Sequence, residues 1–155
     1  MAIWYNKNIK LEKLIPLGPD SMSEYLGIEW QELGDDFLKA KMPVDHRTKQ
    51  QVGLLHGGAN CVLAETLGSV ASFNVIDASE FYCVGIEINA NHIRSVEVGF
   101  VYGTASPLHL GRTTHVWDIR IVNEEGKLVC VSRHTESIIK RKDQSEVEYP
   151  AKTTS

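Results

Sequence analysis

The segment QQVGLLHGGANCVLAETLGSVAS, residues 50–72, predicts a central helix that begins at a pair of glycines. Beyond Gly57 and Gly58 the side chains are apolar or small, and Glu65 is the single charged residue among them. A helix that is apolar around most of its circumference is expected to be buried. The turn residues at 77–79 indicate its end, so we expect the helix over 58–76. A carboxylate buried without a partner costs folding free energy, so we expect Glu65 to have a functional role.

The residues before this helix predict short elements. Two helical pieces are expected at 9–15 and 21–26, separated by a break at Pro16, Gly18 and Pro19. Strands are expected at 28–33 and 37–42, and the Gly-Asp-Asp sequence between them indicates a hairpin.

The residues after the helix predict strands that pack on one side. The β-rich runs are 82–93, 96–105, 112–122 and 127–139, and the last two form a hairpin. Trp117, Ile119 and Ile121 alternate with a more polar set, as expected when one face of a sheet covers a core. We therefore expect an α+β fold in which an antiparallel sheet wraps around one long helix.

Length and charge indicate one domain. The chain has 155 residues, of which 43% are hydrophobic and 23% charged, and this composition suits a single core. We assign the domain to residues 1–140 and expect the charged residues 141–155 to form a flexible tail. The net charge is only −4 and no dense Lys/Arg stripe occurs, so we expect no nucleic-acid partner.

Cysteine spacing and hydropathy indicate a cytoplasmic protein without a metal site. The cysteines lie in apolar runs without a C-x-x-C pair and are expected to be reduced core residues: Cys61, Cys83 and Cys130. His46, His115 and His134 lack metal-ligand spacing and are expected at the surface or in sheet packing. No apolar run is long enough for a membrane span, and the N-terminus lacks a signal-peptide pattern.

The start of the helix is a candidate binding site for a carbonyl or an oxyanion. Gly57 and Gly58 let a ligand approach the backbone closely, where unpaired N–H groups concentrate partial positive charge. Gln50 and His56 can add hydrogen bonds at the same end. The alternative is that the glycines only form a tight turn into the helix.

One face of the helix is a second candidate. Cys61, Glu65, Ser69 and Ser72 are spaced by four, four and three residues, so they share a face, with Gly68 beside them. Small residues around a carboxylate make room for a substrate. The alternative is a close-packing stripe in which Glu65 forms an ion pair.

The distance between these two candidates predicts a shared site. Gly57 and Glu65 are eight residues apart, or roughly 12 Å along a helix, which is too far for both to touch one reacting carbonyl. If both groups take part, Glu65 must come from a second copy of the helix. This predicts a two-fold symmetric dimer with composite sites.

Several motifs together resemble a known family. Gln50 followed by His56-Gly57-Gly58, and then the sequence AETLGS at 64–69, closely resemble the hotdog-fold acyl-CoA thioesterases of the phenylacetate/hydroxybenzoyl-CoA type. The resemblance extends over residues 3–139. Further motifs resemble the enterobacterial branch that contains dihydroxynaphthoyl-CoA and enterobactin proofreading thioesterases: MPVD at 42–45, GIEINANH at 85–92, PLHLG at 107–111 and VW at 116–117.

This resemblance implies catalytic roles for named residues. The Gly57 N–H is expected to donate a hydrogen bond to the thioester carbonyl, assisted by Gln50 and the region of His56. Glu65 is expected to act from the other subunit as nucleophile or general base, a choice that the sequence leaves open. Ser69 is expected to help position substrate and water.

The resemblance also implies a coenzyme A site and an assembly. Residues expected along the pantetheine and nucleotide are Gly85, His92, Ile93, Arg94, Ser95, His109, Leu110, Gly111 and Arg112. His92 would also help position substrate and water, whereas composition alone favours surface roles for Arg94 and Arg112. The family fold is a curved antiparallel sheet around one central helix, paired into homodimers and then homotetramers. No cofactor is expected beyond the coenzyme A of the substrate.

Two departures from the family pattern leave the substrate open. Val52 replaces a proline or aromatic residue, and His-Thr-Glu at 134–136 is more polar than the expected apolar ending. Aromatic or medium-chain acyl-CoA is expected, with 1,4-dihydroxy-2-naphthoyl-CoA of menaquinone synthesis as one candidate. The alternatives are proofreading of acyl or aryl carrier-protein thioesters, a hotdog dehydratase or hydratase, and a non-catalytic acyl-CoA-binding protein.

Overall fold

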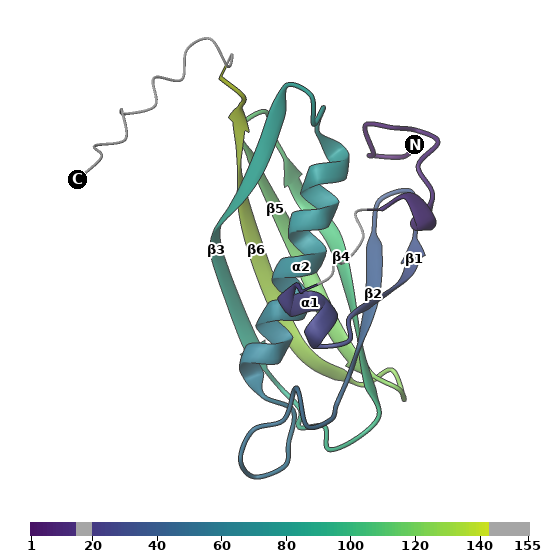
Figure 1. The fold of residues 1–155 in the computed structure, drawn as a ribbon, viewed down its shortest axis with the longest axis vertical. Coiled ribbons are helices and arrows are strands. Elements are labelled where there is room, and N and C mark those ends of the chain that lie inside the picture. Colours follow the sequence, from purple (N-terminus) through teal and green to yellow (C-terminus); the bar gives the residue numbers. More distant parts are fainter. Residues whose placement is uncertain (15–19, 143–155) are drawn as a thin grey trace, which may run out of the picture.

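The computed structural model describes residues 1–14 and 20–142, which form an antiparallel sheet and one long helix (Figure 1). The strands lie in the spatial order β1-β2-β4-β5-β6-β3, and every neighbouring pair is antiparallel. Their bounds are β1 Glu29–Leu33, β2 Leu38–Pro43, β3 Phe81–His92, β4 Phe100–Leu110, β5 Thr114–Asn123 and β6 Leu128–Lys140. The helix α2 spans Gly57–Val75, within one residue of the expected range. The predicted α+β hotdog fold is confirmed.

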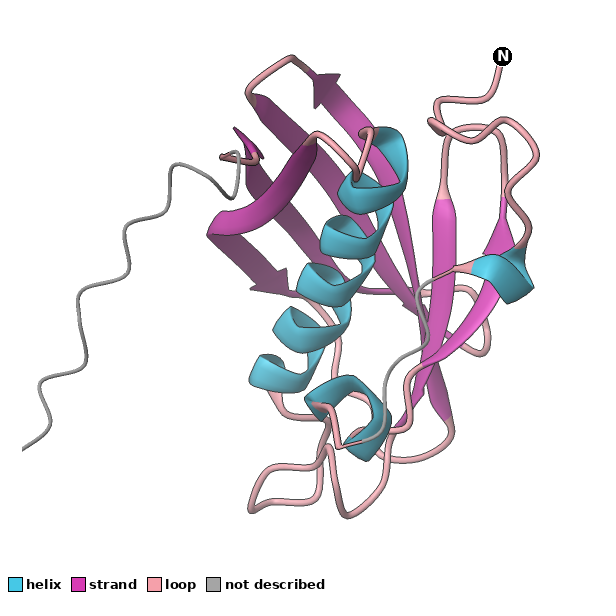
Figure 2. Ribbon diagram, turned by 45° about the horizontal axis from the view of Figure 1, so that its top comes forward, coloured by secondary structure: helices cyan, strands magenta, loops and turns pink. Residues whose placement is uncertain are grey.

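Helix α2 packs across one face of the sheet (Figure 2). Its buried side chains include Leu63, Leu67 and Ala71, and β5 contributes the fully buried Trp117, Ile119 and Ile121. The alternation predicted for β5 is therefore confirmed. Gly103 on β4 permits the close approach, because a Cβ at this position would lie 2.6 Å from Leu67 Cδ1.

The N-terminal residues contact the first hairpin and the C-terminal end of α2, where Tyr5 N–H donates to the Asn74 carbonyl. The predicted hairpin is confirmed as β1 and β2, and Trp4 Nε1 donates to the Gly34 carbonyl at its turn over 2.7 Å. The expected helical pieces are shorter than predicted: η1 is Leu11–Lys13 and α1 is Met22–Tyr25. The break expected at 16–19 lies outside the described residues, as does most of the expected tail.

The start and end of β4 differ from the prediction. The strand was expected over 96–105, whereas residues 96–99 form a loop and the strand continues to Leu110. Gly99 adopts a φ of 87°, which interrupts extended structure before β4, and the Val96 carbonyl accepts a hydrogen bond from Leu55 N–H. This bond ties the loop to the residues before α2.

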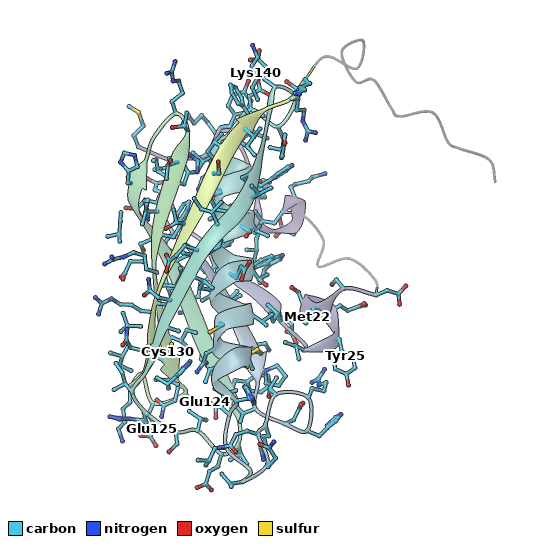
Figure 3. The ribbon with its side chains drawn as sticks, turned by 90° about the vertical axis from the view of Figure 1, so that its left-hand side faces the viewer. Met22, Tyr25, Glu124, Glu125, Cys130 and Lys140 are labelled. Atoms are coloured by element: carbon cyan, nitrogen blue, oxygen red, sulfur yellow. The ribbon has the colours of Figure 1, made fainter. Side chains whose placement is uncertain are left out.

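Strand β3 forms one edge of the sheet and pairs only with β6 among the described strands. Figure 3 views the molecule from this side, with β3 in front beside α2. The register shifts between Gly85 and Glu87, and Val84 and Ile86 are exposed large apolar residues at this shift. Within the described residues, β3 therefore presents an unpaired edge with apolar side chains.

Candidate active site

A cavity of about 250 Å³ opens at the N-terminal end of α2. It is lined by Gln50, Leu54, Leu55, Gly57, Asn60, His92, Ile93, Arg94 and Ser95. Gln50 and Gly57, the two donors expected near the helix start, thus line the same cavity as residues 92–95, which were expected to contact coenzyme A. Leu54, Leu55 and Asn60 were not among the predicted site residues.

The start of α2 leaves the Gly57 N–H available to a ligand. His56 is the N-cap residue, and its Nδ1 accepts a hydrogen bond from Gly58 N–H over 2.8 Å. No acceptor for the Gly57 N–H occurs within the described chain. The Gly58 N–H is already bonded to His56 Nδ1, so the free backbone donor at the cavity is the Gly57 N–H. His56 therefore shapes the helix start, and its Nδ1 is not free to contact a carbonyl.

Gln50 is held with its amide nitrogen free. Its Oε1 accepts a hydrogen bond from Val52 N–H over 2.9 Å, and this contact fixes which end of the amide is the acceptor. The NH₂ group remains to donate into the cavity. Val52 itself is 75% exposed, so this departure from the family pattern does not form a wall of the cavity.

His92 packs directly against Gly57. A Cβ on Gly57 would lie 2.7 Å from His92 Nε2, so only glycine admits the ring at this distance. Asn60 Nδ2 lies 3.4 Å from His92 Nδ1, while the buried Asn60 Oδ1 has no hydrogen-bond partner in the described part of the chain. An asparagine is a poor helix former among apolar neighbours, and this was the sequence signal for Asn60.

Glu65 is exposed, which corrects the expectation of a buried lone carboxylate. The reason is that Glu65 lies over the β3 edge of the sheet, whereas buried residues of α2 such as Leu63 and Leu67 pack on the inner strand β4. A Cβ on Gly85 would lie 3.2 Å from Glu65 Oε1. Glu65 does not line the cavity that holds Gly57, as expected from their separation along α2.

Ser69 contacts a buried cluster that the sequence analysis missed. Its Oγ donates to Glu136 Oε1 over 2.5 Å, and His134 Nε2 lies 2.7 Å from the same oxygen. Although burial alone lowers the pKa of His134, the hydrogen bond to Glu136 and the carboxylate charge raise it above its usual value. His134, expected in sheet packing, is thus half of a buried ion pair next to a predicted site residue.

Ser72 is directed away from the other candidates on its predicted face. It is fully buried, and its Oγ accepts a hydrogen bond from Trp117 Nε1 over 2.7 Å. This side chain belongs to the core, so the polar stripe predicted on α2 ends at Ser69.

The remaining predicted coenzyme A residues lie elsewhere in the chain. Gly85 is on the β3 edge beside Glu65. The 110–112 segment lines a separate cavity of about 340 Å³ with Val75 and Ile76, at the opposite end of α2. His109 and Arg112 are exposed. Within one chain, the structure does not bring this segment together with residues 92–95.

The three cysteines are poor candidates for the nucleophile. All three cysteines are free, in agreement with the prediction of reduced residues. Burial and the charge of Glu136 raise the pKa of Cys83 to about 12, and burial raises that of Cys130 to about 11. Burial also raises the pKa of Cys61. A thiol that is protonated at neutral pH is a weak nucleophile, so the reactive carboxylate candidate remains Glu65.

The chain belongs to the thioesterase superfamily, whose family model matches residues 52–130. Solved structures agree: a mutant thioesterase from Pseudomonas aeruginosa superposes with a TM-score of 0.87 at 46% identity, covering 90% of this chain and 100% of that one. The fold and the paired donors at α2 therefore define a hotdog thioester hydrolase. No described helix is long and apolar enough to cross a membrane.

Two curated relatives indicate the branch of the superfamily. The 1,4-dihydroxy-2-naphthoyl-CoA hydrolase of Escherichia coli is 51% identical over 137 residues, which cover 88% of this chain and 99% of that protein. The proofreading thioesterase EntH of Cronobacter turicensis is 46% identical over 138 residues, covering 88% of this chain and 98% of that protein. The resemblance stated from the motifs is confirmed.

Proposed function

We propose that this enzyme hydrolyses an aromatic acyl-CoA, with 1,4-dihydroxy-2-naphthoyl-CoA as the first candidate, at sites shared between two copies of the chain. The observation that carries this proposal is the separation of its reactive groups. Gln50 and Gly57 line one cavity, whereas Glu65 is exposed over the β3 edge outside it. A second copy placed along β3 would supply the missing carboxylate.

The chemistry follows from the donors and the carboxylate. The Gly57 N–H and the Gln50 NH₂ hydrogen-bond the thioester carbonyl oxygen, where negative charge develops as the carbonyl carbon is attacked. Glu65 of a second copy either attacks that carbon, forming an anhydride that water opens, or removes a proton from an attacking water. In both routes the C–S bond breaks and coenzyme A leaves as a thiolate. No metal or other cofactor is needed for these steps.

The same assembly accounts for the scattered coenzyme A residues. Arg94 lies at the cavity and Arg112 at the opposite end of α2, and both are exposed. Antiparallel copies of α2 would bring the Arg112 end of one chain toward the Arg94 end of the other, where guanidinium groups suit phosphates. We propose a homodimer that assembles further into a homotetramer in the cytoplasm.

Complementation between two inactive variants tests the shared site. Gly57→Pro removes the N–H donor at the first helical position, where proline is tolerated, while Glu65→Gln removes the carboxylate. Co-expressed and mixed at random, the two chains form hybrid dimers with one intact site, so activity should return to roughly a quarter of the wild-type rate. Thiol release with DTNB measures the rate. If the hybrid dimers have no activity, each chain carries a complete site.

A second candidate is proofreading of aryl groups held on a carrier protein, supported by the similarity to EntH. Matched thioesters of one aromatic acid, on coenzyme A and on a carrier protein, separate the two. The coenzyme A ester should give the larger kcat/KM. A carrier-protein ester that reacts at least tenfold faster would favour proofreading, and binding without thiol release from either would indicate a non-catalytic protein.

A further inference from the structure

The cluster formed by Ser69, His134 and Glu136 lies between α2 and β6, beside the exposed Glu65. His134 is 1% exposed and Glu136 is fully buried. His134 Nδ1 lies 3.0 Å from the Glu87 backbone carbonyl, and its Nε2 lies 2.7 Å from Glu136 Oε1. The Ser69 hydroxyl donates to the same Oε1 over 2.5 Å.

Counting protons fixes the direction of each hydrogen bond. A carbonyl oxygen only accepts, so His134 Nδ1 carries a proton toward Glu87. One further proton is shared between His134 Nε2 and Glu136 Oε1, in a pair with no net charge. The Ser69 proton also points to Oε1, and His134 Nε2 lies 3.3 Å from Ser69 Oγ, so this contact uses one lone pair of the hydroxyl. The second lone pair is left for another partner. Ser69 can therefore only accept a hydrogen bond from a ligand or water.

The placement of this acceptor matters because Glu65 is one helical turn away on the same face of α2. A Cβ on Gly85 would lie 2.9 Å from His134 Cε1 and 3.2 Å from Glu65 Oε1, so the ring and the carboxylate flank the same glycine. A water between Glu65 and Ser69 would donate one proton to each. Its lone pair would then face away from both acceptors, toward a substrate.

Stability alone is a poor explanation for this cluster. Buried ion pairs contribute little net stability compared with apolar side chains of similar size. Glu136 Oε2 is buried and has no hydrogen-bond partner among the described residues, which adds an unfavourable term. A costly and incompletely paired carboxylate beside a reactive group requires another role.

We propose that His134 and Glu136 are positioning residues that hold Ser69 as an obligate acceptor for the water activated by Glu65. This inference rests on the proposed thioester hydrolysis. The water oxygen forms the new C–O bond, one of its protons passes to Glu65, the C–S bond breaks, and the departing thiolate takes that proton from the Glu65 carboxylic acid. The second water proton stays hydrogen-bonded to Ser69 during the attack.

Glu136→Gln tests the proposal, because it reverses the hydrogen-bonding pattern. With His134 Nδ1 still donating to Glu87, a neutral ring accepts at Nε2 and the new amide donates to both Nε2 and Ser69. The Ser69 proton is then turned toward the water. We expect kcat to fall about 10- to 100-fold with KM within about twofold.

A double-mutant cycle with Ser69→Ala shows whether the effect passes through Ser69. Ser69→Ala should lower kcat to a similar extent, and Glu136→Gln should add nothing further in the Ser69→Ala background. If the double variant instead loses kcat by the product of the two single losses, His134 and Glu136 do not act through Ser69, and the positioning role is wrong. The matched control is Ser72→Ala, which removes a buried serine from the same helix and should leave kcat unchanged.

A measurement independent of activity keeps the inference separate from the proposed function. In ¹⁵N-labelled wild-type protein, the imidazole signals of His134 should show a protonated Nδ1 from pH 6 to 8. A neutral ring protonated only at Nε2 would overturn the proton count, even if no thioester were hydrolysed. If His134 Nδ1 is protonated but Glu136→Gln turns over at the wild-type rate, the hydrogen bonds of the cluster are as described and the cluster has no role in catalysis.

Discussion

Two serine–histidine contacts lie one turn apart on α2, and their surroundings differ completely. Ser72 accepts from Trp117 Nε1 over 2.7 Å and lies 3.2 Å from His115 Nδ1, deep in the apolar core. Ser69 donates to Glu136 and lies 3.3 Å from His134 Nε2, and its remaining lone pair is unmatched near Glu65. Burial therefore does not separate structural from functional polar groups. Matched donors and acceptors characterise the first contact, and an unmatched acceptor characterises the second.

The largest expected effect comes from the carboxylate beside the Ser69 contact. Glu65→Gln should lower kcat about 100- to 10,000-fold, because general-base or nucleophilic attack by this group is lost. The melting temperature should change little, since the side chain is exposed in the chain. Steady-state thiol release and thermal unfolding check both statements, and a wild-type rate would remove Glu65 from the mechanism.

The Ser72 contact should show the opposite pattern. Ser72→Ala leaves the Trp117 indole N–H without an acceptor in the core, so the free energy of unfolding should fall by about 1–3 kcal/mol. Activity per folded molecule should stay at the wild-type level. Urea unfolding measures the first quantity and the DTNB assay the second. A variant that keeps its stability but loses turnover would place Ser72 with the functional group of residues.

The two histidines should change stability in opposite directions with pH. Burial opposes the charged form of His134, but the hydrogen bond and charge of Glu136 outweigh it and raise the pKa of this side chain. The contribution of His134 to the free energy of unfolding is therefore full below about pH 6.5 and is lost as pH rises through the pKa of the folded state. Burial lowers the pKa of His115, so stability is lost as pH falls below 6.5. Urea unfolding of the wild type, His134→Gln and His115→Gln at pH 5 and pH 8.5 compares them, and slopes of the same sign would contradict this assignment.

A partly exposed ion pair should contribute least. The hydrogen bond from Arg47 lowers the pKa of Asp45 to about 2, so this carboxylate stabilises the fold above about pH 3.8 and loses its effect as pH falls toward 2. Asp45→Asn should lower the free energy of unfolding by less than about 1 kcal/mol at pH 7, because solvent screens the pair. If Asp45→Asn lowers the free energy of unfolding as much as Ser72→Ala does, then solvent exposure does not weaken the Asp45–Arg47 pair relative to the buried Ser72–Trp117 hydrogen bond.

Local patterns predicted most of the fold. The apolar run and its glycines located α2, the alternation in β5 identified the buried face, and the Gly-Asp-Asp turn located the first hairpin. The start of β4 was missed because residues 96–99 have strand-like side chains, while the positive φ of Gly99 and the Leu55–Val96 hydrogen bond decide their conformation. These are tertiary effects that local propensity does not contain.

The site was predicted in part, for equally physical reasons. Gln50, Gly57 and residues 92–95 do meet in one cavity. Glu65 was expected to be buried because a single sequence does not show that this position of α2 lies over the edge of the sheet. His134 and Glu136 were missed although their spacing of two places both side chains on one face of β6, and that alternation was the available signal.

The unpaired edge of β3 also bears on how the protein behaves in solution. Its free backbone groups and the exposed Val84 and Ile86 form a template on which further strands could add without limit, the starting point of an aggregate. The two-fold pairing proposed for catalysis would close this edge. Mutations that weaken the pairing should then cause precipitation and loss of turnover together, so that one contact governs both solubility and chemistry.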